Sequence, residues 1–323
     1  MKKLVIAGGT GFLGQVLARH FTRKNWQVII LTRDPHPPTF VGQPLNWNGE
    51  TLGSWTAALE GAHAIVNLCG KSVDCRYHPS NRKQILDSRI APTRVLAQAI
   101  QKLERPPAVW LNAASATIYR HSLETPMDEN HGELGDGFSV DICRAWEAAF
   151  FEDNLTQTRR VALRTSMVLG HGKNSVYPIL ARIARCGMGG KLGSGEQMVS
   201  WIHEADFARA VEFAIDDEEI SGTLNVTAPA PLRNSVFMRA IRGAVRIPFG
   251  LPHYRPMLEV AAWLLRTETE LTLKSRFAVP AKLLKRRFVF YYPFVDEALG
   301  DLARNRPLGL APLGPQIAHN FKP

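Results

Sequence analysis

Three glycines near the N-terminus, Gly8, Gly11 and Gly14, have the spacing of a loop that holds the pyrophosphate of a dinucleotide. We expect Gly8 to permit a tight turn, Gly11 to let the backbone approach the phosphates, and Gly14 to let a helix pack against a strand. The N–H groups at the start of that helix would face the phosphates. The predicted cofactor contacts here are Gly8, Thr10, Gly11, Phe12, Leu13 and Gly14. The alternative interpretation is an ordinary glycine-rich turn.

An arginine follows the second apolar run, residues 26–32, at the place where a carboxylate would bind the adenosine 2′-hydroxyl of NAD. A guanidinium suits a 2′-phosphate instead, because it forms bidentate, charge-assisted hydrogen bonds with phosphate oxygens. We therefore expect NADP as the cofactor, with Thr32 and Arg33 in contact with it. The alternative is that Arg33 is a solvated loop residue and that Asp34 holds the ribose.

Further cofactor contacts are expected where later strands end. The apolar run at residues 64–68 is followed by Cys69 and Gly70, and in a doubly wound sheet its carboxyl end lies beside the first loop. Leu68, Cys69 and Gly70 should therefore touch the cofactor, with Cys69 acting as a small packing residue rather than a reactive thiol. Val168, in the loop after the sixth predicted strand, is another expected contact.

A long helix is expected over residues 79–103, where Pro92 should kink the helix or divide it. Arg89 interrupts the apolar pattern of this helix. We expect its guanidinium to reach a cofactor phosphate or ribose, and the alternative is a surface arginine.

The candidate catalytic residue is Ser115, which follows a predicted strand at residues 108–114. A hydroxyl at the carboxyl end of a central strand lies where ligands bind in such sheets. Tyr119 and His203 are alternative proton donors. Their structural interpretations are that Tyr119 packs under the loop and that His203 holds a loop to the sheet.

These side chains require a parallel sheet whose strands end at one edge. Strand and helix patterns alternate up to about residue 170, and the remainder is more irregular. The predicted fold is α/β: a doubly wound Rossmann-type parallel sheet with a smaller, mostly helical C-terminal substrate region. The predicted division is a dinucleotide-binding Rossmann domain at 1–170 and an interleaved substrate-side region at 171–323.

Composition narrows the class of protein. The 323 residues are 45% hydrophobic and carry a formal charge of +10, without a nucleic-acid-binding motif. The four cysteines form no CxxC pair and have no zinc-site spacing, so no metal site is expected. We expect a cytoplasmic protein that binds a small-molecule substrate and neither nucleic acid nor membrane, with a homodimer as the candidate assembly.

Several segments taken together resemble the atypical epimerase-like branch of the extended short-chain dehydrogenase/reductase superfamily, the NAD-dependent epimerase/dehydratase type. They are 8–14, Asn67–Gly70, Ser115–Tyr119, Trp201–Asp206 and Asn225–Pro229. Residues 280–284 and 288–293 are similar to the C-terminal domain of unknown function of that branch. The resemblance implies chemistry by a Ser–Tyr–Lys set, in which Ser115 matches the serine, Tyr is the general acid/base, and Lys holds the ribose.

The chain departs from that pattern. No Tyr-x-x-x-Lys occurs, and the helix at the right distance has either Ser139 and Cys143 or, one residue later, Val140 and Arg144. Relatives that act on nucleotide-sugars often carry an arginine just before the Ile-His pair, whereas this chain has 199–201 Val-Ser-Trp, which favours a less charged substrate. The prediction is an NADP(H)-binding epimerase-like oxidoreductase of unknown substrate, and the alternative is a non-catalytic NADP(H) sensor.

Overall fold

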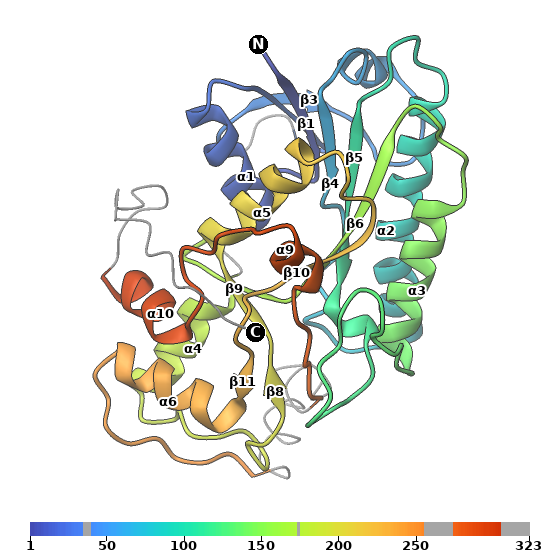
Figure 1. The fold of residues 1–323 in the computed structure, drawn as a ribbon. Helices are drawn as coiled ribbons and strands as arrows, with labels where there is room; N and C mark the ends of the chain where they lie inside the picture. The colour runs from blue at the N-terminus through green and yellow to red at the C-terminus, as the bar shows by residue number, and fades with distance from the viewer. Residues whose placement is uncertain (35–39, 173–174, 255–273, 305–323) are drawn as a thin grey trace.

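A seven-stranded parallel sheet forms the centre of the computed structural model, which describes residues 1–34, 40–172, 175–254 and 274–304 (Figure 1). The strand order is β10-β6-β5-β4-β1-β2-β3. The order reverses at β1, so the carboxyl ends of β1 and β4 flank a crevice of the kind that binds ligands in doubly wound sheets. The strands are β1 (Lys3–Ala7), β2 (Gln27–Thr32), β3 (Gln43–Asn46), β4 (Ala64–Asn67), β5 (Val109–Ser115), β6 (Arg159–Thr165) and β10 (Gly222–Val226).

Helices cover both faces of the sheet, which is why the central strands are apolar throughout rather than alternating. On one face lie α1 (Phe12–Arg23) and α5 (Glu204–Asp216), and on the other lie α2 (Pro79–Ile100) and α3 (Phe138–Phe151) (Figure 1). Each layer buries its own apolar cluster against the strands. The doubly wound fold predicted from the sequence is thereby confirmed.

The sequence predicts a kink or a division at Pro92, but α2 runs unbroken through this residue, so the division is wrong. A proline removes one backbone donor, and the flanking turns remain helical because their side chains pack into the sheet layer. Thr93 also donates its hydroxyl to the backbone oxygen of Arg89, at 2.7 Å.

The C-terminal part carries smaller elements, most of them below the sheet, while the short helix at 281–285 lies beside β10 (Figure 1). They are β7 (Met167–Leu169), α4 (Val176–Arg185), β8 (Met198–Val199), β9 (Trp201–His203), β11 (Leu232–Arg233), α6 (Asn234–Ala244), α9 (Ala281–Lys285) and α10 (Val295–Ala303). Val168, expected in a loop, lies in β7, which pairs in parallel with β9. Both β10 and α5 come from beyond residue 170 and belong to the main sheet and its helical layer.

Candidate cofactor site

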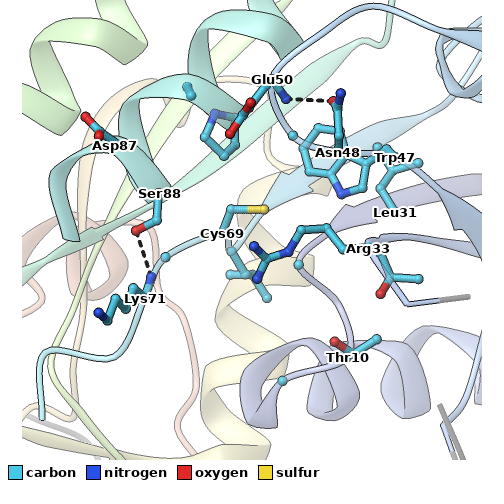
Figure 2. A pocket seen from close by; sticks show the side chains of 18 of the residues that line it. Thr10, Leu31, Arg33, Trp47, Asn48, Glu50, Cys69, Lys71, Asp87 and Ser88 are labelled. Carbon is cyan, nitrogen blue, oxygen red and sulfur yellow. Dashed lines mark hydrogen bonds between the residues drawn. The ribbon is translucent and has the colours of Figure 1, made fainter. Parts of the chain in front are cut away.

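A cavity of about 670 Å³ opens where β1, β2 and β4 end (Figure 2). Its walls come from the glycine loop, the ends of β2 and β3, the loop after β4, and one face of α2. The lining residues are Gly8, Thr10, Gly11, Leu31, Thr32, Arg33, Asp34, Trp47, Asn48, Gly49, Glu50, Leu68, Cys69, Gly70, Lys71, Gln84, Asp87, Ser88, Ala91 and Pro92.

The glycine loop has the geometry that an approaching phosphate needs. Gly8 has φ +71°, which side chains rarely adopt, while the nearest atom to a Cβ at Gly11 would be 3.8 Å away. A Cβ at Gly14 would clash with the backbone of Gly9, so Gly14 lets α1 pack against the loop itself. No side chain caps the N-terminus of α1 at Gly11, which leaves the first N–H groups for an anion.

Gln15 fixes the loop from behind, a role that the sequence analysis missed. Its buried amide donates to the backbone oxygen of Gly9 at 2.9 Å and accepts from the backbone N–H of Val41 at 2.9 Å. The signal was a polar residue on the apolar face of α1.

The end of β2 brings a cation to the cavity. Arg33 is exposed, and Figure 2 shows its guanidinium extending across the cavity toward Cys69. No ion pair holds Arg33 within the described ranges, so its donors face the cavity. Thr32 is buried, and its hydroxyl closes a turn with the backbone of Asp34. Asp34 also lines the cavity, so both sequence-based interpretations of this turn remain compatible with its position.

The segment after β3 forms a wall that the sequence analysis did not assign. Asn48 accepts hydrogen bonds from the backbone N–H groups of Glu50 and Thr51, both at 2.9 Å, and its amide donates to the Thr51 hydroxyl. Trp47 packs edge-on against Trp55, with ring centroids 5.2 Å apart.

The turn after β4 lies where it was expected, because Leu68, Cys69 and Gly70 all line the cavity. The backbone N–H of Cys69 donates to the side chain of Asn67 at 3.1 Å. Burial raises the pKa of the Cys69 thiol to about 12, although Arg33 opposes the shift. The thiol is therefore protonated at neutral pH and packs against Gly8.

Other predicted contacts lie outside the cavity wall. These are Phe12, Leu13, Gly14, Arg89, Ser115 and Val168. Val168 belongs to the apolar cluster between the sheet and the layer of α1 and α5. The Phe12 ring packs against the glycines of the loop after β7, where a Cβ at either Gly170 or Gly172 would meet it.

Arg89 lies directly behind Gly70, between α2 and α3. Its Nη1 donates to the backbone oxygens of Lys71, at 3.1 Å, and Ile85, at 2.9 Å. The guanidinium stacks over the ring of Trp146, 5.1 Å from the centroid, and burial lowers its pKa. A Cβ at Gly70 would lie 3.1 Å from the Arg89 Cζ, so the absence of a side chain at Gly70 makes room for the guanidinium.

Ser115 is the last residue of β5, as expected. Its hydroxyl accepts the backbone N–H of Thr117 at 3.2 Å. On α3, both Ser139 and Cys143 are buried, whereas Arg144 is exposed and donates to the backbone oxygen of Gly135 at 2.8 Å. Burial raises the pKa of the Cys143 thiol to about 12. The inward face of α3 therefore carries Ser139 and Cys143, and neither is a strong acid at neutral pH.

Tyr119 is 1% exposed, and its hydroxyl is hydrogen-bonded within the protein. Its hydroxyl accepts from Arg164 Nη1 at 3.0 Å, and lies 2.8 Å from Asn225 Oδ1 and 3.0 Å from the backbone oxygen of Asp128, to one of which it donates. Burial raises its pKa, outweighing Arg164. These contacts fit the structural interpretation of Tyr119, because its hydroxyl has no free position for a substrate.

His203 is also held by the fold. Its Nδ1 accepts the backbone N–H of Ala205 and so caps α5, and its Nε2 lies 3.6 Å from the carboxylate of Asp301 on α10. The imidazole stacks on the Tyr292 ring, with centroids 4.0 Å apart. The histidine therefore joins β9 and α5 to α10, in keeping with a structural role.

The described ranges contain neither a metal-binding cluster nor a membrane-spanning helix. No group of three or more His, Cys, Asp and Glu side chains there could hold a metal ion. No helix in those ranges is both long and apolar enough to cross a bilayer.

Known proteins with similar sequences and structures indicate the same fold and family. The model of the NAD-dependent epimerase/dehydratase family matches residues 4–227. The epimerase family protein ML0860 of Mycobacterium leprae is 34% identical over 306 residues, covering 94% of this chain and 96% of that protein. The crystal structure of human epimerase family protein SDR39U1 with NADPH has a TM-score of 0.83 and 28% identity, covering 94% of this chain and all of that one. MoeE5 in complex with UDP-glucuronic acid and NAD has a TM-score of 0.74 at 16% identity, covering 94% and 98% of the two chains, which is a likeness of fold alone.

Proposed function

The chain belongs to the NAD-dependent epimerase/dehydratase family, in an atypical branch of the extended short-chain dehydrogenases/reductases, and we propose an activity on that basis. The proposed activity is that of an NADP(H)-dependent oxidoreductase or epimerase. The fold and the glycine loop account for binding of a nicotinamide dinucleotide. The preference for NADP and the catalytic residues are the proposed part.

The position of Arg33 is the main support for the proposed preference for NADP. It extends into the cavity from the end of β2, without an ion-pair partner among the described side chains. A guanidinium at this position would bind a 2′-phosphate with two parallel hydrogen bonds, and these are strong because both partners are charged. The similarity to a human protein whose structure contains NADPH supports the same choice.

The residues assigned to the cofactor fall into three groups. Backbone N–H groups of Gly11, Phe12 and Leu13 would hold the pyrophosphate, and Thr32 and Arg33 would hold the adenosine end. Leu68, Cys69 and Gly70 would line the crevice at the end of β4, with Arg89 behind them as a partly buried cation. The bound nicotinamide would supply or accept the hydride.

Ser115 is the proposed contact for a substrate oxygen, because it ends the central strand β5. Tyr119 and His203 are engaged in the fold, and α3 offers Ser139 and Cys143 in place of the tyrosine and lysine. The proton donor is therefore a water molecule or a group of the substrate itself. The second candidate function is a non-catalytic NADP(H) sensor, which these replacements on α3 favour.

The cofactor preference is tested by measuring NADPH and NADH dissociation constants for Arg33→Ala by calorimetry. The substitution removes the charge that pairs with the 2′-phosphate, so we expect about a tenfold or greater rise in Kd for NADPH and little change for NADH. Arg94→Ala, which removes an exposed arginine of α2 outside the cavity wall, is the matched control. An equal loss for both cofactors would contradict the role of Arg33.

A turnover assay distinguishes the two candidate functions, an enzyme and a non-catalytic NADP(H) sensor. NADPH oxidation is followed with a panel of carbonyl compounds, using the wild type and Ser115→Ala. An enzyme should oxidise NADPH with at least one compound, and Ser115→Ala should lower the rate while leaving the Kd for NADPH unchanged. Tight NADPH binding without turnover on any compound would favour the sensor.

A further inference from the structure

A carboxyl group is buried behind the glycine loop, and the proposed chemistry does not use it. Glu204 is the first residue of α5 and only 3% exposed. The parallel pairing of β7 with β9 places Leu169 beside His203, so Gly170 lies next to Glu204. A Cβ at Gly170 would clash with Glu204 Oε2, so the carboxyl group packs directly on this loop.

Glu204 and two residues close to it, Arg19 and His171, each have a buried polar atom without a hydrogen-bond partner in the part of the chain that the structure describes. These atoms are Oε2 of Glu204, Nε of Arg19 and Nε2 of His171. A fourth such atom is Nε2 of His203, the residue before Glu204, which lies 3.6 Å from Asp301. Native proteins rarely leave such atoms unsatisfied, so this cluster is poised to gain or lose a proton or to hold a water molecule.

The surroundings of Glu204 favour its neutral form. Burial raises its pKa to about 8, and Asp301 of α10 acts in the same direction, while the His171 N–H and Arg19 of α1 oppose the shift. The pKa of Glu212, on the same helix, is lowered instead of raised. Against the effect of burial, hydrogen bonds from His20 and Lys24 lower the pKa of Glu212 to about 2. Glu204 is thus a carboxyl group that titrates just above neutral pH.

The cluster is in contact with the segment that would receive the cofactor phosphates. Phe12 is the first residue of α1, and its ring packs against Gly170 and Gly172. The loop at 170–172 therefore lies between Glu204 and the start of α1. Arg19 is also part of α1, seven residues after Phe12, and it reaches the carboxyl group electrostatically.

We propose that Glu204 is a positioning residue that takes up a proton when NADP(H) binds, so that cofactor affinity depends on pH. In the complex, an O–H bond forms at Glu204 with a proton from solvent. The neutral carboxyl group keeps the loop at 170–172 packed on Phe12, and a negatively charged cofactor at the start of α1 disfavours the carboxylate. The inference rests on the proposed cofactor binding.

The sign of the linkage follows from these charges. An anionic ligand stabilises the protonated form, so the pKa of Glu204 rises on binding and the cofactor binds more tightly at low pH. If binding raises this pKa by about one unit, the complex takes up about 0.4 proton at pH 8. The Kd then rises about fivefold between pH 7 and pH 9.

The test is calorimetric titration of the full chain with NADPH at pH 8 in two buffers with different ionisation enthalpies. At this pH the 2′-phosphate is already fully ionised, and the thiols of Cys69 and Cys143, each with a pKa of about 12, stay protonated. We expect the wild type to take up about 0.4 proton and Glu204→Gln to take up none. The Kd of the variant should be constant between pH 7 and pH 9.

Glu212→Gln is the matched control, since it removes a carboxylate from the same helix that stays ionised, and it should leave proton uptake unchanged. Glu204→Met provides a second neutral side chain in case the glutamine disturbs packing. Equal proton uptake by wild type and both Glu204 variants, or none by the wild type, would overturn the proposal. Failure of the wild type to bind NADPH at pH 7 would instead contradict the proposed function.

Discussion

At the scale of single residues, burial decides what the reactive groups can do. Cys69 and Cys143 both lie at the predicted site, yet burial raises the pKa of each thiol to about 12. Tyr119 has the phenol that the chemistry of the superfamily requires, but its hydroxyl is taken by Arg164 and Asn225. Arg33 remains as an exposed cation in the cavity, and it is the residue from which the cofactor preference is argued.

The thiols provide a prediction at this scale. At pH 8, a thiol reagent should label exposed Cys186 rapidly, and Cys69 and Cys143 at least about tenfold more slowly, because only the thiolate reacts. Labelling of each cysteine is followed by peptide mapping over time. Fast labelling of Cys69 in the folded protein would contradict its assignment as a packing residue.

At the scale of elements, α1 and α5 form the support of the glycine loop. One end of their interface holds Glu204 and Arg19, and the other holds Glu212, which accepts from His20 at 2.9 Å and from Lys24 at 2.6 Å. The two ends differ electrostatically, because Glu204 has no hydrogen-bonded cation among the described residues, whereas Glu212 is hydrogen-bonded to the Lys24 ammonium and to the His20 imidazole. The pair of helices is therefore fixed at the end distant from Glu204 and sensitive to protonation at the end near Phe12.

The hydrogen bonds of Glu212 with His20 and Lys24 should contribute to the free energy of unfolding in a pH-dependent way. The pKa of Glu212 is depressed to about 2 in the folded state, so its contribution is present above its unfolded value, near 4.3, and is lost as pH falls through 2. Glu212→Gln should lower the free energy of unfolding at pH 7, and its difference from wild type should shrink between pH 5 and pH 2. Urea unfolding at several pH values measures this, and a difference independent of pH would contradict the ion-pair explanation.

At the scale of the whole molecule, segments from beyond residue 170 complete the sheet layer. Arg159 of β6 donates to the backbone oxygens of Ala214, Ile215 and Ile220, and the Lys282 ammonium donates to those of Ser221 and Thr223. Arg286 forms a bidentate pair with Asp217. The Arg159 contacts, together with β10 and α5, join the two predicted regions, whereas the Lys282 and Arg286 contacts hold α9 and the residue after it to β10 and to the end of α5 within the second region.

We therefore expect the chain to unfold as a single cooperative unit in spite of the predicted division at residue 170. Tryptophans of the sheet layer, such as Trp110, and of the C-terminal cluster, such as Trp201, should report the same urea midpoint as far-UV circular dichroism. The measurement compares the two signals and checks for a single calorimetric peak. Two separate transitions would instead support independently folding regions.

The comparison of sequence and structure separates local from non-local information. The glycine loop, the strand ends near Arg33, Cys69 and Ser115, and the alternation of strands and helices could all be predicted, because turn chemistry and apolar periodicity depend on short segments. The assignments of Arg89 and Ser115 to cofactor and substrate remain predictions. Helix α2 passing through Pro92, and Val168 lying in a strand, were missed because tertiary packing overrides local preference.

By itself, the sequence determined the α/β class, the dinucleotide loop, and the absence of a Tyr-x-x-x-Lys pair. Only the tertiary structure decided which side chains meet across the chain. It places Trp47 and Asn48 in the cavity wall and engages the hydroxyl of Tyr119 in hydrogen bonds within the protein. It also buries Glu204 against the loop that packs on Phe12. The physical reason is that hydrogen-bond saturation and desolvation depend on neighbours distant in sequence, which no short pattern of residues specifies.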